Sequence, residues 1–186
     1  MQGKVDFSRV NIRRLEEDDF VKSFDCGDAD INEFVLKESS LYRKSLLAVS
    51  YVLVDKDTPT DVIGFFSMAN DKVALGDFES KTEFNRFRKQ QGFPQPKRLR
   101  SYPAIKLCRL GVSNAYKGEN VGTFLLDFVK TYFTSDNKSG CRFLTVDAYI
   151  NAVPFYEKNG FCMLGSGRDD NPYTRLMFYD LNEIVA

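Results

Sequence analysis

The fold of this chain is decided by residues 104–133, AIKLCRLGVSNAYKGENVGTFLLDFVKTYF, which predict a strand, a short loop and a helix in direct succession. The segment from Ala104 to Val112 is rich in apolar and β-branched residues, as strands are. Aliphatic and aromatic residues then recur at helical spacing from Val121 to Phe133. The loop between them, 113–120, therefore leads directly into a helix.

The start of this predicted helix has the features of an anion-binding site. Backbone N–H groups in the first turn of a helix have no partner within the helix, and they lie at the positive end of its dipole. Small residues there allow a phosphate to approach the backbone closely. The residues concerned are Lys117, Gly118, Glu119, Asn120, Val121, Gly122 and Thr123. The alternative interpretation is that this loop is only a connection.

A second segment, downstream, favours the anion-binding interpretation. Val146, Asp147 and Ala148 end another predicted strand, and Asn151 is placed to cap a following helix. That helix ends in the sequence FYEKNGF, residues 155–161.

Together the two segments resemble the GNAT superfamily of N-acetyltransferases. The acetyl-CoA site of that family is a strand, a loop of pattern Arg/Gln-x-x-Gly-x-Gly/Ala and a helix, and a later helix often reads Asn-x-x-Ala-x-x-Phe-Tyr-x-Lys-x-Gly-Phe. The residues that match the later helix directly are Phe155, Tyr156, Lys158, Gly160 and Phe161. The resemblance implies an α/β (α+β) fold whose central, mostly antiparallel mixed sheet has six to seven strands. It also implies that the sheet is splayed at the acetyl-CoA site and flanked by four to five helices.

This chain departs from the family loop at two positions. Lys117 stands where the family prefers Arg or Gln, and Asn120 stands where it prefers the first Gly. Lysine keeps the positive charge but loses the planar fork of donors. Asparagine tolerates a left-handed backbone, so we expect the turn to form.

The resemblance assigns further residues to the coenzyme. It implies that the strand ending at residues 110–112 parts from the strand at 144–147, and that the pantetheine arm lies in the gap. Unpaired backbone groups of Leu110 and Val112 would then bond the thioester and the amide arm. Asn151 is a second expected contact, with helix capping as an alternative role. The predicted cofactor-binding residues are Leu110, Val112, Lys117, Gly118, Asn120, Val121, Gly122, Thr123 and Asn151.

Tyr156 is the predicted catalytic acid, because a phenol within reach of the sulfur can donate a proton to the departing thiolate. The alternative is a buried aromatic residue packed beside Phe155. The general base stays open between Glu83, Asp71, Asp147 and a water relay, since no carboxylate stands out by its spacing.

Composition limits the other function classes. The chain has 186 residues and a formal charge of zero, which fits one domain, 1–186, with no general attraction to nucleic acid or membrane. It has no histidine, and its four cysteines form no Cys-x-x-Cys pair, so hydrolase and metal-site predictions lose their usual residues and we expect no metal. We expect a cytoplasmic protein, since neither a membrane span nor a signal peptide is found.

One segment is nevertheless strongly basic. Residues 81–106 hold eight basic residues against one acidic residue, Glu83, a net charge of +7. The eight are Lys81, Arg86, Arg88, Lys89, Lys97, Arg98, Arg100 and Lys106. All of them except Lys106 belong to a predicted helical insertion at about 71–103. The basic segment presents either a solvated charged face or a surface for coenzyme phosphates, an acidic substrate or RNA.

The first third of the chain predicts a strand at 10–15, a helix capped by Asp28, and a hairpin of strands at 46–54 and 62–69. Gly64 within the second hairpin strand indicates a bulge or close packing. Phe24-Asp25-Cys26-Gly27, with Ile31, Asn32 and Phe34, resembles the opening of the GNAT toxin branch. That branch acetylates aminoacyl-tRNA and is held by a ribbon-helix-helix antitoxin. The alternative is a simple capped amphipathic helix.

We therefore expect an acetyl-CoA-dependent N-acetyltransferase in which a primary amine of undetermined identity attacks the thioester directly. The alternatives are a toxin-type enzyme acting on aminoacyl-tRNA, with tRNA and an antitoxin as partners, and a module that binds CoA without turnover. Both a monomer and a homodimer are compatible with the sequence.

Overall fold

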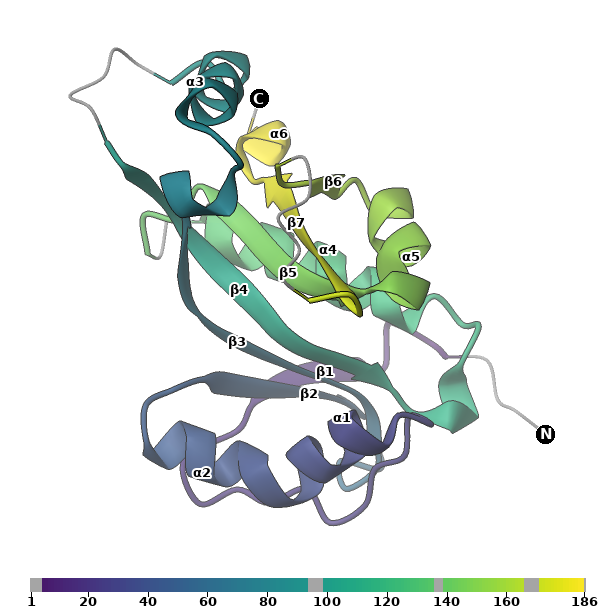
Figure 1. The fold of residues 1–186 in the computed structure, drawn as a ribbon. Helices are drawn as coiled ribbons and strands as arrows, with labels where there is room; N and C mark the ends of the chain where they lie inside the picture. Colours follow the sequence, from purple (N-terminus) through teal and green to yellow (C-terminus); the bar gives the residue numbers. More distant parts are fainter. Residues whose placement is uncertain (1–4, 94–98, 136–138, 166–170, 186) are drawn as a thin grey trace. The chain divides into compact units, whose positions relative to one another are not determined.

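The computed structural model describes residues 5–93, 99–135, 139–165 and 171–185. Within these residues the chain forms a seven-stranded sheet with the strand order β1-β2-β3-β4-β5-β7-β6 (Figure 1). The chain divides into two compact units, one of residues 1–69 with 107–129 and the other of residues 70–106 with 130–186. Strands β3 and β4 each continue from one unit into the other. The predicted mixed α/β fold with a mostly antiparallel sheet is confirmed.

The first unit is built on one end of the sheet. Its elements are β1 (Val10–Arg14), α1 (Ala29–Glu33), a π-helix (Phe34–Glu38), α2 (Ser39–Lys44), β2 (Val49–Asp55), most of the first half of β3 (Val62–Ala74), the end of β4 (Ser101–Val112), a 3-10 turn (Asn114–Tyr116) and most of α4 (Val121–Thr134). Strand β1 is antiparallel to β2, and β2 is antiparallel to β3.

A bulge interrupts the β2–β3 ladder beside Gly64. Leu53 is opposite Gly64, whereas the next residue of β2, Val54, is opposite Val62, so that Ile63 is the extra residue. A Cβ atom at Gly64 would lie 2.9 Å from Leu125 Cδ1 and 3.4 Å from Val121 Cγ1. Gly64 therefore serves both predicted purposes, since it allows a bulge and the close approach of α4.

The first helical segment differs from its predicted pattern. Asp28 caps α1 as predicted, with its side chain accepting a hydrogen bond from Ile31 N–H at 3.0 Å. The π-turn that follows, in which Ser39 N–H donates to Phe34 O, adds one residue to the helix. Phe34 is buried, whereas Leu41, seven residues later and thus near the same face of a regular helix, is 61% exposed.

The positions buried after the π-turn are polar, namely Ser39, Ser40 and Arg43. Arg43 donates through Nε to Glu16 O at 2.9 Å and through Nη1 to Ser39 Oγ at 3.2 Å, and its Nη2 bonds Asp19 O. This guanidinium therefore fixes the segment that follows β1 to the end of the helix.

The second unit holds the aromatic core. Its elements are the rest of β3, a 3-10 turn (Leu75–Asp77), α3 (Lys81–Gln90), the start of β4, β5 (Phe143–Tyr149), a 3-10 turn (Ile150–Ala152), α5 (Val153–Lys158), β6 (Cys162–Met163), β7 (Thr174–Asp180), α6 (Asn182–Val185) and the last turn of α4. The rings packed around Phe143 come from α3, the segment just after it, β4 and β7, namely Phe87, Phe93, Tyr102 and Phe178.

Strand β5 is antiparallel to β7 along its whole length, from Phe143 opposite Asp180 to Tyr149 opposite Thr174. It is parallel to β4, with paired residues from Ala104 with Phe143 to Lys106 with Thr145. The predicted separation of β4 from β5 further along stays a prediction.

Several predicted boundaries shift by a few residues. Strand β2 begins at Val49 rather than Leu46, and β3 runs five residues beyond Ala69. Lys97 and Arg98 of the basic segment lie outside the described residues. Across the described ranges, no helix is long and apolar enough to cross a membrane.

Candidate functional site

The loop before α4 forms the turn that the sequence predicts. Asn120 has a left-handed backbone with φ +60°, and Gly118 has φ +84°. No atom would lie within 4 Å of a Cβ at Gly118, so its conformation rather than crowding requires glycine there. The asparagine therefore replaces the glycine of the family pattern without loss of the turn.

This turn leaves a group of backbone donors at the start of α4. Phe124 N–H donates to Asn120 O at 3.0 Å, which closes the first turn of the helix. The N–H groups of Val121, Gly122 and Thr123 precede that bond and have no carbonyl four residues back within α4. They lie at the positive end of a helix of 14 residues, where an anion is favoured.

The start of α4 is held firmly against the sheet of its own unit. Val121 is 1% exposed, and Leu125 is fully buried. Ser113 N–H donates to Ile63 O at 2.9 Å, which joins the end of β4 to the bulge of β3. Gly64 allows α4 to approach β3 closely, because any side chain there would displace Leu125 or Val121. The donors of the loop are therefore presented by a rigid support.

A second support for the loop comes from the segment that resembles the toxin branch. Asp25 Oδ2 accepts a hydrogen bond from Asn114 Nδ2 at 2.9 Å, and Asp25 O accepts one from Asn114 N–H at 2.8 Å. Its other carboxylate oxygen accepts from Gly27 N–H at 2.8 Å and from Asn32 Nδ2 at 2.9 Å. These four bonds, which we call the Asp25 clamp, join the start of α1 to the 3-10 turn that precedes Lys117.

The electrostatics of the clamp favour an ionised Asp25. The hydrogen bonds from Gly27 N–H, Asn32 and Asn114 lower the pKa of Asp25, and the charge of Lys117 lowers it further. A Cβ at Gly27 would lie 3.1 Å from both Lys117 Nζ and Asn114 Oδ1. The ammonium of Lys117 is thus packed against Gly27, near Asp25.

The sequence analysis missed the Asp25 clamp. Asp25 and Asn114 are 89 residues apart, and local patterns carry no signal for such a pair. The sequence did carry one usable signal. Asp28 alone caps the helix, so the nearby Asp25 was free for another role, such as a contact with a distant part of the chain.

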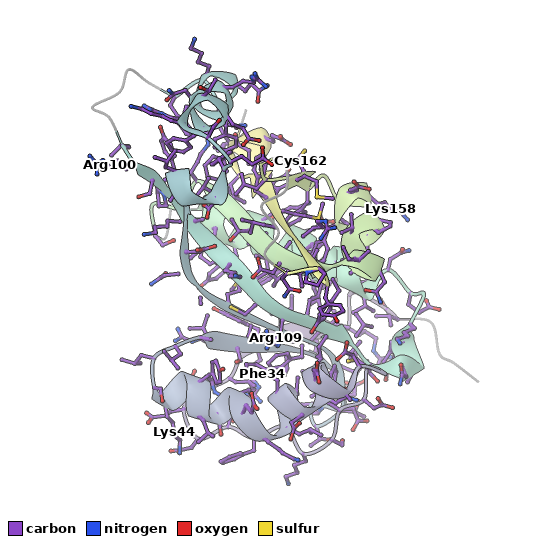
Figure 2. The ribbon with its side chains drawn as sticks, in the orientation of Figure 1. Phe34, Lys44, Arg100, Arg109, Lys158 and Cys162 are labelled. Carbon is purple, nitrogen blue, oxygen red and sulfur yellow. The ribbon has the colours of Figure 1, made fainter. Side chains whose placement is uncertain are left out.

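Two further predicted coenzyme contacts, Leu110 and Val112, lie at the end of β4 in the same unit. Leu110 and Val112 are both partly exposed and flank Gly111, which is buried. A Cβ at Gly111 would lie 3.1 Å from Phe24 and Ile31, so the opening segment packs directly on the strand. Arg109, next in sequence, holds its guanidinium 5.0 Å from the ring centre of Phe34 (Figure 2).

The other two predicted site residues, Asn151 and Tyr156, both belong to the second unit. Tyr156 lies on α5, is 7% exposed, and packs edge-on against Phe155 and Phe161 at ring distances of 5.2 and 5.3 Å. Burial raises the pKa of its phenol well above its usual value, so the group keeps its proton at neutral pH. Among the described residues no hydrogen bond is found for its hydroxyl, which leaves this proton available to a ligand.

Asn151 lies in the 3-10 turn just before α5 and is exposed. Its alternative role as a helix cap is wrong, since the cap position is Ala152 and no side chain caps α5. Pro154 stands in the first turn of α5, where its missing N–H costs little. The side chain of Asn151 therefore has no structural duty at the helix start.

The three carboxylates considered as a base are all engaged in the second unit. Asp147 forms an ion pair with Lys106, Thr145 donates a hydrogen bond to Asp71, and Glu83 accepts one from Glu79 N–H at 3.0 Å. Their geometry singles out none of them. Within the described ranges no group of three or more histidine, cysteine or acidic residues is placed to hold a metal ion.

Comparison with known proteins identifies what this part of the chain is similar to. A sequence model described as the acetyltransferase (GNAT) domain matches residues 95–174, which include the loop, α4, β5 and α5. Over these residues the chain matches a GNAT acetyltransferase domain. The predicted resemblance to this superfamily is thereby confirmed.

Solved structures share the fold over nearly the whole chain. A tyrosine-to-phenylalanine mutant of KacT is 23% identical, with a TM-score of 0.74 over 95% of this chain and 98% of that one. AtaT complexed with acetyl-methionyl-tRNAfMet is 22% identical, with a TM-score of 0.74 over 95% and 97%. AtaTR bound with acetyl-CoA is 20% identical, with a TM-score of 0.74 over 96% and 98%. At these identities the likeness establishes the GNAT fold of this chain.

Proposed function

We propose that this GNAT domain is an acetyl-CoA-dependent N-acetyltransferase that moves the acetyl group directly to a primary amine. The observation that carries the proposal is the left-handed turn at Gly118 and Asn120, followed by three backbone donors at the start of α4. A pyrophosphate is the part of acetyl-CoA that such a group of donors fits. The residues at the matching positions are Lys117, Gly118, Asn120, Val121, Gly122 and Thr123.

The remaining residues have separate tasks in this proposal. Backbone groups of Leu110 and Val112, with the side chain of Asn151, bind the arm of the coenzyme. The amine nitrogen attacks the thioester carbonyl, the new C–N bond forms, and the C–S bond breaks. The substrate ammonium loses its first proton to water or to one of the open bases before the attack. Tyr156 donates its phenolic proton to the departing thiolate, and the second proton released by the amine nitrogen returns through solvent to the phenolate.

Thiol release tests the reaction. The protein is mixed with acetyl-CoA and single amines, and free CoA is measured with a thiol reagent. We expect amine-dependent release and an acetylated amine of matching quantity by mass spectrometry. Binding of CoA without release for every acceptor class would instead support a CoA-binding module, and absence of binding would contradict the proposal.

A second candidate concerns the acceptor, which we propose is the α-amino group of an aminoacyl-tRNA. The support is the Phe24–Asp28 motif, whose aspartate is built into the site, together with the fold shared with AtaT, whose structure holds acetyl-methionyl-tRNAfMet. A toxin of this type would have tRNA as substrate and a small antitoxin as protein partner. A structure of AtaT bound to the C-terminus of the antitoxin AtaR illustrates such a partner for a chain of the same fold.

The acceptor is tested by offering total aminoacyl-tRNA, the same tRNA after deacylation, and free amino acids with labelled acetyl-CoA. Label retained on aminoacyl-tRNA alone is expected. Label on free amines but not on aminoacyl-tRNA would remove the toxin-type acceptor while leaving the acetyltransferase proposal intact. A homodimer belongs to this proposal as well and is tested by light scattering.

A further inference from the structure

Described residues on either side of 94–98 line a cavity in the second unit that the acetyl-transfer proposal does not use. The cavity has a volume of about 650 Å³, which lies within the range of small-ligand sites. It lies among the 3-10 turn after β3, the helix α3 and the residues that lead into β4. Its lining residues are Leu75, Lys81, Phe84, Asn85, Arg88, Leu99 and Arg100, and we call it the α3 cavity.

The backbone fixes the two sides of the α3 cavity. Leu75 N–H donates to Arg100 O at 3.3 Å, which joins the 3-10 turn to the segment before β4. Ser80 caps α3 by accepting from Glu83 N–H at 3.1 Å, so the helix starts at a defined position. Phe84 is packed against Phe78 beneath, at a ring distance of 5.2 Å.

The charge of the lining has one sign. Among the described residues, the lining includes three cationic side chains, from Lys81, Arg88 and Arg100, and no carboxylate. The neighbouring acids have other partners, because Asp77 accepts from Ala74 N–H at 2.6 Å and Glu83 accepts from Glu79 N–H at 3.0 Å. A ligand for this cavity is therefore anionic.

Arg88 is held in a fixed orientation. Its Nε donates to Tyr102 Oη at 2.8 Å, and its guanidinium carbon lies 5.6 Å from the ring centre of Phe84. A guanidinium fixed in this way loses little freedom when it binds a phosphate, and its flat face also stacks on planar rings. These contacts distinguish Arg88 from an arginine whose guanidinium is surrounded only by solvent.

Apolar groups make up the rest of the lining. Leu75 and Leu99 are both exposed at the rim although they are large and apolar. An inorganic anion would make no favourable contact with these two leucines, whereas a nucleotide combines a phosphate with a flat, weakly polar base that can pack on them. The charge, the size and the apolar rim of the cavity all fit a nucleotide.

We propose that the α3 cavity binds a nucleotide unit, with its phosphate on Lys81, Arg88 and Arg100 and its base against the guanidinium face and the two leucines. The unit is either a free nucleotide or one residue of an RNA strand, since both present the same group. This binding requires no acetyl transfer, so it is tested without acetyl-CoA.

The experiment measures the anisotropy of fluorescein-labelled hexa-adenylate RNA on titration with the full chain, with unlabelled AMP as competitor. We expect saturable binding whose association constant falls as the salt concentration rises, with a slope of about −0.7 in a log–log plot, as one neutralised phosphate on a single strand would give. The paired variant Lys81→Gln with Arg100→Gln changes two exposed side chains and is expected to weaken binding about tenfold. Arg88→Lys, which keeps the charge but loses the fork, is expected to weaken it as well.

The matched control is Arg14→Gln with Lys22→Gln, which removes the same charge from exposed positions of the other unit. The control is expected to bind RNA within twofold of the unaltered chain. Competition by AMP at concentrations comparable to those of RNA residues identifies a free nucleotide as the ligand, and competition by RNA alone identifies a strand. The proposal is overturned if neither probe binds, or if the control weakens binding as much as the cavity variant.

Discussion

The phenol of Tyr156 combines two properties that rarely occur together in a tyrosine. It is buried among aromatic rings, which raises its pKa, and yet no protein group of the described chain holds its hydroxyl. Such a group stays protonated through the neutral range, and we propose that it gives its proton to the thiolate that departs from acetyl-CoA.

Tyr156→Phe removes this proton and little else. We expect kcat to fall by about 10²-fold or more, the usual contribution of a general acid, while KM for acetyl-CoA stays within about twofold. Tyr173→Phe, at an exposed position, is the control and is expected to keep full activity. Unchanged kcat in Tyr156→Phe would show that the residue is only part of the core.

Asn120 provides a second test at the scale of one residue. Its φ of +60° is tolerated by asparagine and glycine but costs a β-branched residue about 1–3 kcal/mol. We expect Asn120→Gly to bind CoA within about threefold of the unaltered chain, and Asn120→Val to be less stable and to bind at least tenfold more weakly. Calorimetric titration with CoA and thermal unfolding measure the two effects separately.

At the scale of elements, the Asp25 clamp connects the start of α1 with the turn before the proposed phosphate loop. Asp25→Asn keeps the shape but weakens the charge-assisted bond to Asn114, and Asn114→Ala removes its partner. We expect each change to raise KM for acetyl-CoA about five- to tenfold with kcat little altered, and the double variant to be no worse than either single one. Asp28→Ala, which removes only the cap of α1, is the control, and an equal rise of KM there would mean that general loosening is responsible.

The same carboxylate makes stability depend on pH in a definite direction. Its pKa in the folded chain is lowered below the ordinary 3.8, so its stabilising contribution is present above that value and is lost as the pH falls through the folded pKa. The difference in unfolding free energy between the unaltered chain and Asp25→Asn should therefore be largest near neutral pH and shrink below about pH 4. Urea unfolding at several pH values measures it, and a constant difference would contradict the assignment.

Local features of these elements could be predicted, and distant pairings could not. The cap at Asp28, the left-handed turn at Asn120 and the bulge beside Gly64 each follow from the conformational preference of one residue type. The π-turn and the buried Arg43 were missed, because a helix pattern assumes 3.6 residues per turn throughout. The order of the strands was accessible only through the family resemblance.

At the scale of the whole molecule, coenzyme binding is expected to stabilise the folded chain. A ligand at 100 times its Kd contributes about 2.7 kcal/mol, which for a chain of this size raises Tm by about 5–10 °C. Thermal unfolding with and without CoA checks this, and Asn120→Val is the control with a reduced shift. An unchanged Tm in the presence of CoA would contradict the assignment of the loop as a phosphate site.

The π-turn at Phe34–Glu38 has a consequence for how this helical segment tolerates changes in length. One residue corresponds to about 100° of rotation, so deleting a single position there would turn every later side chain of α2 by that angle. Arg43 would leave its three carbonyl and hydroxyl acceptors, and a different set of side chains would face the strands. We therefore expect a one-residue deletion in this segment to be more damaging than most point substitutions. The number of residues, and not only their identity, decides which face of the helix is exposed to solvent.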